Sequence, residues 1–162
     1  MKIWARIKKL SFPQLWQFSV LFLKHPLLII PTLQATKRTF QICDTLYGKE
    51  HHKSNKANAF RHALWNVLLC KNSMKRFKNK QKSVFWAQNI TDLYEKVTQN
   101  EVLEEAMDLH NNTIGRICFL NFLDQNEEEI VTFLQNKAEN SQKVEKLNAF
   151  KKHQNQLVYL LE

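Results

Sequence analysis

The chain has 162 residues, of which 44% are hydrophobic, a length and composition that fit one domain with its own core. With only two glycines and three prolines, it cannot carry the glycine-rich loops of Rossmann and P-loop enzymes or the G-x-S-x-G turn of α/β-hydrolases. Its net charge of +9 divides into +15 over residues 1–82 and −6 over residues 83–162. Such a basic half favours either attraction to the acidic half or an anionic partner.

Residues 1–34 are an apolar and basic N-terminal segment, which we separate from a helical domain over residues 35–162. A Lys-His-Pro sequence at 24–26 divides the apolar run, and neither part reaches the roughly 20 residues that a bilayer-spanning helix needs. We therefore expect two short helices, broken at Pro26 and Pro31. They either pack on the core or lie in a membrane interface, and a cleaved or membrane-spanning segment is the least favoured alternative. The residues that would meet such a membrane are Trp4, Phe12, Trp16, Phe18 and Phe22, with Lys2, Arg6, Lys8 and Lys9 beside anionic headgroups.

Further along the chain, apolar residues recur at the three- and four-residue spacing of amphipathic helices. Gly48 fits the C-terminal cap of the first of these helices, and Asn58 fits the N-cap of the second. No segment alternates apolar and polar residues as a half-buried strand does, so we predict an all-α fold, a single compact domain with about six to seven helices. The expected helices cover residues 32–47, 58–70, 83–97, 102–123, 126–137 and 141–159.

The connections between these helices are polar. Residues 49–58 are expected to form a polar loop. They include the adjacent His51 and His52, which we expect in contact with solvent because neighbouring histidines do not easily face one ion. Residues 71–82 are expected to form a basic connector. The run of three glutamates at 127–129 suits the first turn of a helix, where negative charge interacts favourably with the helix dipole.

The three cysteines, Cys43, Cys70 and Cys118, are an odd and widely spaced set without a C-x-x-C pair. This pattern favours buried, free thiols in a reducing compartment over a disulfide framework or a zinc site. We therefore expect the protein to be cytoplasmic or peripheral to the membrane.

Two segments place polar residues where a helix normally carries good helix formers. In the segment NAFRHALWN, His62 lies beside the apolar face, with Asn58 and Asn66 within about one turn of it. In the segment MDLHNNTIGR, one face carries Asp108, Asn111, Asn112 and Gly115, whereas His110 points with the apolar residues. Asp, Asn and Gly all weaken a helix interior, and local rules broken together often mark a site. Gly115 also leaves space for a backbone or a ligand to come close.

Two interpretations of these polar residues are possible. In the structural one they form an interhelical network in which Asp108 pairs with Arg61 or Arg116 and the amides satisfy helix ends. In the functional one, His62 and Asp108 line a pocket together with Glu95.

The same segments resemble a family of largely uncharacterised bacterial domains. Its members carry N-A-F-R-H-A-x-W-N, then an acidic D-x-H-E, then M-D-L-H-N-N-x-x-G-R. The chain matches the first motif over residues 58–66 and the last over residues 107–116, so that the family core spans residues 58–116. The middle block reads TDLYEK and places Glu95 correctly, but Tyr94 stands where the family has His. The resemblance implies a set of positions and does not specify a reaction.

Those positions suit two kinds of hydrolytic chemistry. His62, Glu95, Asp108 and His110 are ligands that zinc, manganese or iron accepts, and a bound ion would acidify a water molecule. Without a metal, His62 would act as general base with Asp108 as its orienting partner. The residues expected to bind or polarise the substrate are Arg61, Asn58, Asn111 and Asn112.

The sequence therefore predicts a hydrolase that acts on an ester or phosphoester near a membrane surface, through His62, Glu95 and Asp108, with a divalent metal as candidate cofactor. The alternative is a non-catalytic binding or inhibitor-like module that keeps the polar network as a scaffold, and the loss of His at position 94 favours it. An anionic membrane and a protein are both candidate partners. Nucleic acid is disfavoured, because the lysines are scattered and no DNA-binding motif is present.

Overall fold

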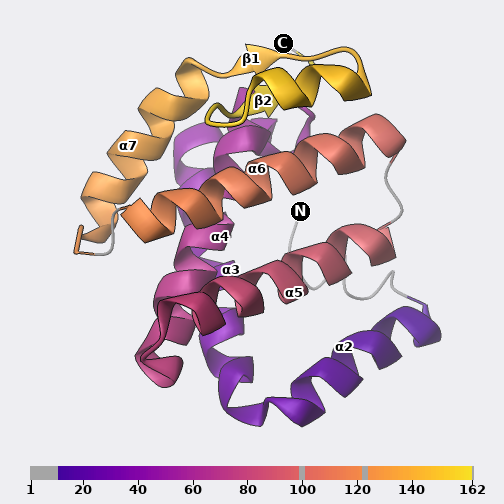
Figure 1. Ribbon diagram of the computed structural model, residues 1–162, viewed down its shortest axis with the longest axis vertical. Helices are drawn as coiled ribbons and strands as arrows, with labels where there is room; N and C mark the ends of the chain where they lie inside the picture. Colours follow the sequence, from indigo (N-terminus) through magenta and orange to yellow (C-terminus); the bar gives the residue numbers. More distant parts are fainter. Residues whose placement is uncertain (1–10, 99–100, 122–123, 162) are drawn as a thin grey trace.

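The computed structural model describes residues 11–98, 101–121 and 124–161, and most of these are helical (Figure 1). They form a single compact all-α domain, as predicted. The α-helices are α2 (Phe12–Lys24), α3 (Ile29–Tyr47), α4 (Lys56–Phe77), α5 (Lys80–Thr98), α6 (Val102–Asn121) and α7 (Glu127–Glu139). The shorter elements are the 3₁₀ helices η1 (Pro26–Leu28), η2 (Glu50–His52) and η3 (Leu147–Lys152) and the strands β1 (Gln142–Lys143) and β2 (Val158–Tyr159).

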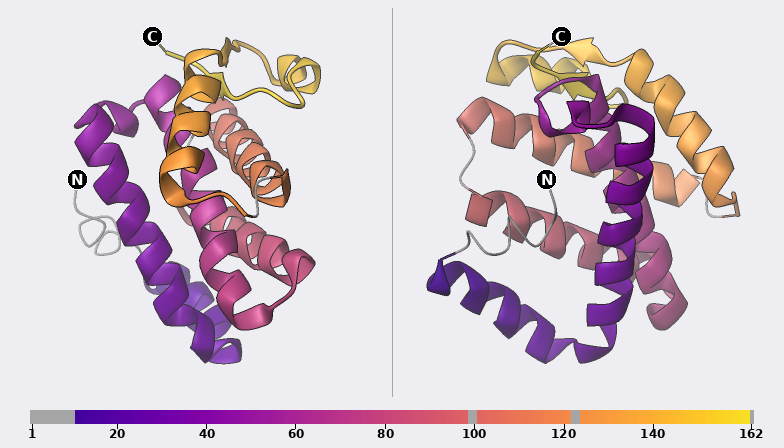
Figure 2. Two further views of the ribbon diagram at one scale, coloured as in Figure 1. Left: turned by 90° about the vertical axis from the view of Figure 1, so that its left-hand side faces the viewer. Right: turned by 180° about the vertical axis from the view of Figure 1, so that it is seen from behind.

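Helix α4 is the centre of the molecule. Every residue of this helix from Ala57 to Cys70 is buried, as expected of a helix that is enclosed on all sides. It contacts α3, α5, α6 and α7. Figure 2 shows α3 on one side of α4 and the pair α5 and α6 on the other, and in Figure 1 the last two run in opposite directions across it. Side chains from three helices therefore meet on the α5–α6 side of α4.

The residues at which α3 and α4 begin and end agree only in part with the predicted boundaries. Gly48, with φ of 56°, ends α3 as expected. Pro31 does not break the segment, because it lies in the first turn of α3, where no backbone N–H donor is required. Asn55, and not Asn58, caps α4, since its side chain accepts the backbone N–H of Asn58.

The basic connector predicted over residues 71–82 is largely helical. Helix α4 continues to Phe77, and Lys78 then adopts a left-handed conformation with φ of 51° that turns the chain. Only Lys78 and Asn79 separate α4 from α5. The helix α7 starts where expected, with Asn126 and Glu129 forming a capping box.

The helix predicted over residues 141–159 is wrong. In its place β1 and β2 form a short parallel pair, with Gln142 opposite Val158, and η3 lies between them. Val144 and Val158 bury themselves against Met107 of α6. This packing overrides the helical periodicity of the segment, because tertiary contacts outweigh local propensity.

The N-terminal segment packs on the core, which was one of its two predicted positions. The rings of Phe22 and His25 lie against Trp86 of α5, at 6.2 and 5.3 Å between centroids. The segment has no sharp end at residue 34, because α3 runs through that position. Trp4 and the four basic residues predicted beside it lie outside the described residues.

Packing leaves one side of this segment uncovered. The exposed apolar residues of α2, η1 and early α3, which we call the N-terminal apolar face, are Phe12, Leu15, Trp16, Leu23, Leu27, Ile30 and Leu33. Within the described residues, no single helix is long and apolar enough to cross a membrane. One pair of helical segments, Leu15–Lys24 and Pro26–Tyr47, is together long and apolar enough for a membrane span by length and composition alone, but the two are bent by 107° relative to each other.

Candidate functional site

Three ionisable side chains from three helices converge in the interior on the α5–α6 side of α4. His62 comes from α4, Glu95 from α5 and Asp108 from α6, and one ligand atom of each lies within 4.8 Å of the others. We call these three residues the buried cluster. Their exposed fractions are 1%, 1% and 4%. The helix packing therefore brings together the three residues that were expected to share a pocket, but it holds them almost out of contact with solvent.

The imidazole of His62 lies between the two carboxylates. Its Nε2 is 3.3 Å from Oδ1 of Asp108, and its Nδ1 is 3.5 Å from Oε1 of Glu95. Buried carboxylates are costly unless positive charge or hydrogen-bond donors lie close. The cluster is therefore stable only as part of a larger polar network.

Two asparagines supply part of that network. The Nδ2 of Asn112 donates to Oε1 of Glu95 at 3.3 Å, and its Oδ1 lies 3.1 Å from Nδ1 of His62. The same Oδ1 accepts a hydrogen bond of 2.7 Å from Nδ2 of Asn66. Asn66 in turn is held by Arg116, whose Nη1 donates to Oδ1 of Asn66 at 3.1 Å. Asn112 is thus an oriented acceptor for a proton on Nδ1 of His62.

Arg61 approaches His62 from the opposite edge of the ring. Its Nη2 lies 2.7 Å from Nε2 of His62, and since a guanidinium has only donors, Nε2 is the acceptor. The neutral His62 ring therefore carries its proton on Nδ1, facing Asn112. The Nη1 of Arg61 donates to the backbone carbonyl of His51, so that this side chain connects the buried cluster to η2.

Both arginines of the network are buried, at 6% exposed for Arg61 and 7% for Arg116. Burial lowers the pKa of Arg116, an effect that the negative charge of Asp92 opposes.

Gly115 allows α6 to approach α4 closely enough for these contacts. A Cβ at this position would lie 2.8 Å from Cα of Ala63 and 2.9 Å from Cβ of Asn66, and still closer to the carbonyl oxygen of Ala63. No side chain fits there, because real Cβ atoms do not approach a backbone so closely. The predicted close approach at Gly115 is confirmed, and the approaching group is the backbone of α4.

Three predicted site residues lie outside the buried cluster. Asn111 binds the C-terminal strand, with hydrogen bonds of 2.9 and 3.0 Å to the carbonyl and N–H of Val158. The Nε2 of His110 donates to the backbone carbonyl of Gln156 at 2.9 Å, so this side chain binds the C-terminal segment. Asn58 is buried in the first turn of α4, and its Oδ1 has no hydrogen-bond partner in the described part of the chain.

Tyr94, which replaces the His of the resembled family, packs its ring edge-on against Trp65 at 5.2 Å between centroids. Trp65 itself donates from Nε1 to Oγ1 of Thr36 on α3. Tyr94 therefore contributes to the contact between α5 and α4, next to Glu95 in the chain.

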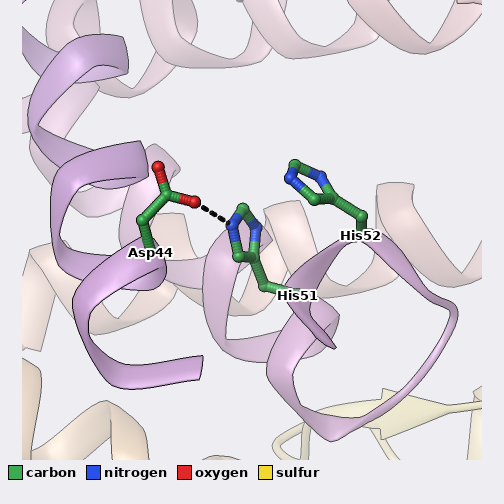
Figure 3. A group of neighbouring side chains, drawn as sticks. All are labelled: Asp44, His51 and His52. Carbon is green, nitrogen blue, oxygen red and sulfur yellow. Dashed lines mark hydrogen bonds and ion pairs between the residues drawn. The ribbon is translucent and has the colours of Figure 1, made fainter. Parts of the chain in front are cut away.

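A second group of ionisable side chains lies at the end of α3, where the sequence predicted a solvated loop (Figure 3). That prediction is wrong for His51, which is fully buried. Its Nε2 lies 2.9 Å from Oδ1 of Asp44, and the ring of His52 lies 4.0 Å from its own ring, measured between centroids. Burial lowers the pKa of His51, and the bond to Asp44 only partly offsets that effect. The predicted geometric objection also fails, because one ligand atom each of Asp44, His51 and His52 lies within 4.8 Å of the others.

The described surface has a cleft of about 470 Å³ at the start of α4. Its lining includes Glu50 and Lys56 and, from the C-terminal segment, Tyr159 and Leu161. None of the three residues of the buried cluster lines it. Because the three residues are at most 4% exposed, they offer a substrate almost no accessible surface in this conformation.

Comparison with protein-family models matches residues 19–142 to one model, described as a domain of unknown function (DUF6973). Neither the curated proteins nor the solved structures give a match. The matched range contains all three residues of the buried cluster and also Asp44, His51 and His52.

Proposed function

We propose that this chain, which belongs to the DUF6973 family of domains of unknown function, hydrolyses an ester or phosphoester bond. The proposal is based on the geometry of the buried cluster. The observation that supports it is the convergence of His62, Glu95 and Asp108 beside the guanidinium of Arg61. A histidine between two carboxylates can remove a proton from water, and an arginine can hold the oxyanion or phosphate that forms.

The hydrogen bonds around His62 give its two ring nitrogens different roles. Asn112, itself held by Glu95, fixes the proton on Nδ1. The basic nitrogen is then Nε2, on the side of Arg61 and Asp108. When Arg61 turns from Nε2 to the substrate, the lone pair of Nε2 is free to take a proton from water, and the Asp108 carboxylate stabilises the imidazolium that forms. In this mechanism Asn112 and Glu95 are the positioning residues. Asp108 stabilises the imidazolium, whereas the sequence had led us to expect it to orient the ring.

A divalent ion is the candidate cofactor of this site. One imidazole and two carboxylates are donors that zinc, manganese or iron accepts, and a bound ion would supply an acidified water molecule. The guanidinium of Arg61, 2.7 Å from Nε2 of His62, repels a cation at that nitrogen. We therefore place the metal-free general-base mechanism first.

Access to the cluster requires a movement, and the C-terminal segment is the element best placed to make it. Val158 is held by Asn111, one turn of α6 from Asp108. The N–H groups of Leu160 and Leu161 both bond to the carbonyl of Ser54. Pairing with β1 and burial of Val158 against Met107 also hold the segment. We propose that its release exposes Asp108 and His62 to substrate.

The proposed place of action is an anionic membrane surface. The N-terminal apolar face exposes large apolar side chains, among them Phe12 at 79% and Leu27 at 72%. No acidic residue precedes Asp44 in the sequence, so the charge beside this face is positive. Exposed apolar residues flanked by basic ones favour an interface with anionic lipids.

The direct test measures release of p-nitrophenol from p-nitrophenyl esters and from bis-p-nitrophenyl phosphate, with anionic vesicles present. The protein is assayed after chelation and after addition of zinc, manganese or iron. His62→Gln and Asp108→Asn should each reduce the rate by about a hundredfold or more, the usual contribution of a general base. Glu128→Gln, at an exposed position on α7, is the matched control and should leave the rate unchanged.

The alternative function is a non-catalytic binding module with the cluster as its scaffold. The near-complete burial of His62 and Glu95 and the packing of Tyr94 against Trp65 favour it. Absence of turnover on both substrates under every metal condition, together with lower melting temperatures of the two cluster variants, would select this alternative and reject the hydrolase.

A further inference from the structure

The group formed by Asp44, His51 and His52 shares no residue with the buried cluster and lies at the end of α3. Asp44 lies in the last turn of α3, and the two histidines come from η2, directly after Gly48 has turned the chain. Figure 3 shows both imidazole rings extending towards the side of the Asp44 carboxylate. The Asp44 side chain is 62% exposed, so solvent reaches the group from that side.

The fold fixes His51 more firmly than a hydrogen bond to an exposed aspartate requires. Its side chain is completely buried, and Phe40 of α3 packs edge-on against its ring at 5.7 Å between centroids. Its backbone carbonyl accepts a hydrogen bond from Arg61. The Nδ1 of His51 is buried and has no hydrogen-bond partner among the described residues. A ring held in this way, beside a second ring and a carboxylate, is prepared for a ligand.

The donor set defines the class of ligand. Two imidazole nitrogens and one carboxylate oxygen are typical of zinc sites with three protein ligands and one open position, and of related transition-metal sites. In a tetrahedral zinc site neighbouring ligand atoms lie about 3.3 Å apart, as follows from bond lengths of about 2.0 Å. One ligand atom each of Asp44, His51 and His52 lies within 4.8 Å of the others, so the donors are close to that spacing. Small side-chain rotations would therefore complete the site.

We propose that Asp44, His51 and His52 bind a divalent transition-metal ion of the zinc class, with a further coordination position open to water. The site lies in the matched family region but has no residue in common with the buried cluster. It is connected to that cluster by Arg61, which bonds to His51 through Nη1 and to His62 through Nη2. Loading of the metal site would restrain η2 and, through Arg61, the environment of His62.

The experiment is a titration of the full chain, freed of metal by chelation, with Zn²⁺ by calorimetry and with Co²⁺ by visible absorption. Asp44→Asn and His52→Gln remove one donor each at exposed or half-buried positions, so that folding should survive. Each variant should weaken binding by at least about tenfold, since even the loss of an outer partner of a metal ligand costs that much. The visible Co²⁺ bands that indicate nitrogen and oxygen coordination should weaken in His52→Gln.

Two further variants make the result specific. Glu50→Gln alters an exposed carboxylate of the same turn, which pairs with Lys53 and is not in the group, and it should bind the metal as the native chain does. Asp108→Asn alters the buried cluster and should also keep this binding. Unchanged affinity in both Asp44→Asn and His52→Gln, or binding that only Asp108→Asn abolishes, would overturn the proposal. So would a native chain that binds neither metal.

Discussion

Gly115 is the residue on which the distance between α4 and α6 depends. We predict that Gly115→Ala lowers the free energy of unfolding by about 1–3 kcal/mol, the usual cost of overpacking. Alanine favours a helix over glycine by roughly 1 kcal/mol, and the predicted loss is what remains after this gain is subtracted from the packing cost. The added methyl group has no space against the backbone of Ala63, and α6 must shift away from it.

Urea unfolding followed by circular dichroism measures this change. Ile117→Ala is the control on the same helix, because Ile117 is partly exposed and its truncation leaves the contact between α4 and α6 intact. A Gly115→Ala variant as stable as the native protein would show that α6 does not need this close approach.

The cysteines give a second prediction at the scale of single residues. Burial raises the pKa of the Cys70 thiol to about 12 and also raises that of Cys118. The thiols are free and buried, as the sequence predicted, and thiolate is the reactive form. We therefore expect no rapid reaction of the folded protein with Ellman's reagent at mildly alkaline pH, and reaction of all three cysteines in guanidinium.

The sign of the linked pH effect follows from the same shift. The folded-state pKa of Cys70 is raised above its ordinary value of 9.0, so its contribution to stability is complete below that pH. It is then lost as the pH rises from about 9 towards 12, because the unfolded state alone can ionise this thiol. A thiol of the native protein that reacts at once with Ellman's reagent would contradict this account.

At the scale of elements, the helices that the sequence predicted well are those with both periodicity and a cap. Gly48 marks the end of α3, and the Asn126–Glu129 pair marks the start of α7. The C-terminal segment carries a helical pattern, and its true structure depends on Met107 and Asn111, which are distant in the sequence. No local pattern shows that contact, so the predicted helix was wrong there.

The site was predictable to a similar degree. The costly polar residues inside two helices, together with the family motifs, pointed to His62, Glu95 and Asp108. The separate roles of Asn111 and Asn112 could not be predicted, because neighbours on one helix turn to different partners, the C-terminal strand and the cluster. The burial of His51 was missed because it results from packing under α3 and has no signal in the polar loop sequence.

Asn111 provides the element-scale prediction. Asn111→Ala should lower the free energy of unfolding by about 1–3 kcal/mol, because it leaves a backbone N–H and a carbonyl of β2 without their partners. The segment from Leu157 to Leu161 should become less protected in hydrogen exchange, whereas α4 keeps its protection. Mass spectrometry of the exchanged protein measures both.

Asn136→Ala is the matched control, since the side chain of Asn136 is exposed on α7. If the hydrolase proposal is correct, faster opening of the C-terminal segment should also raise the rate with substrate. Equal exchange at Val158 in the two variants would show that Asn111 does not hold β2.

At the scale of the whole molecule, the basic half and the acidic half are in contact through an ion pair. Arg38 of the basic half and Glu127 of the acidic half form an ion pair at 2.6 Å. Both side chains are largely exposed, so the pair contributes at most about 1 kcal/mol. This pair therefore neutralises little of the charge of the basic half. Many lysines of this half are exposed and can meet an anionic surface, and the N-terminal apolar face lies in the same half.

This arrangement leads to a prediction for membrane binding. The full chain should float with vesicles that contain phosphatidylserine and bind far less to vesicles of phosphatidylcholine alone, because each basic residue near an anionic surface contributes about 1 kcal/mol. Added salt should weaken the binding by screening. Leu27→Glu should reduce it by about tenfold or more, since the variant both removes buried apolar area and adds a negative charge at the surface.

Phe85→Glu is the control that separates this face from general hydrophobicity. Phe85 is 64% exposed and lies on α5, outside the N-terminal apolar face, and Leu27 is similarly exposed at 72%. The two substitutions change the net charge and the exposed apolar surface in a similar way, so a difference between them reports on position alone. If both variants lose binding equally, the attraction arises from net charge over the whole basic half. If neither loses it, the N-terminal apolar face does not contact the lipid, and the exposed residues from Phe12 to Leu33 need another partner.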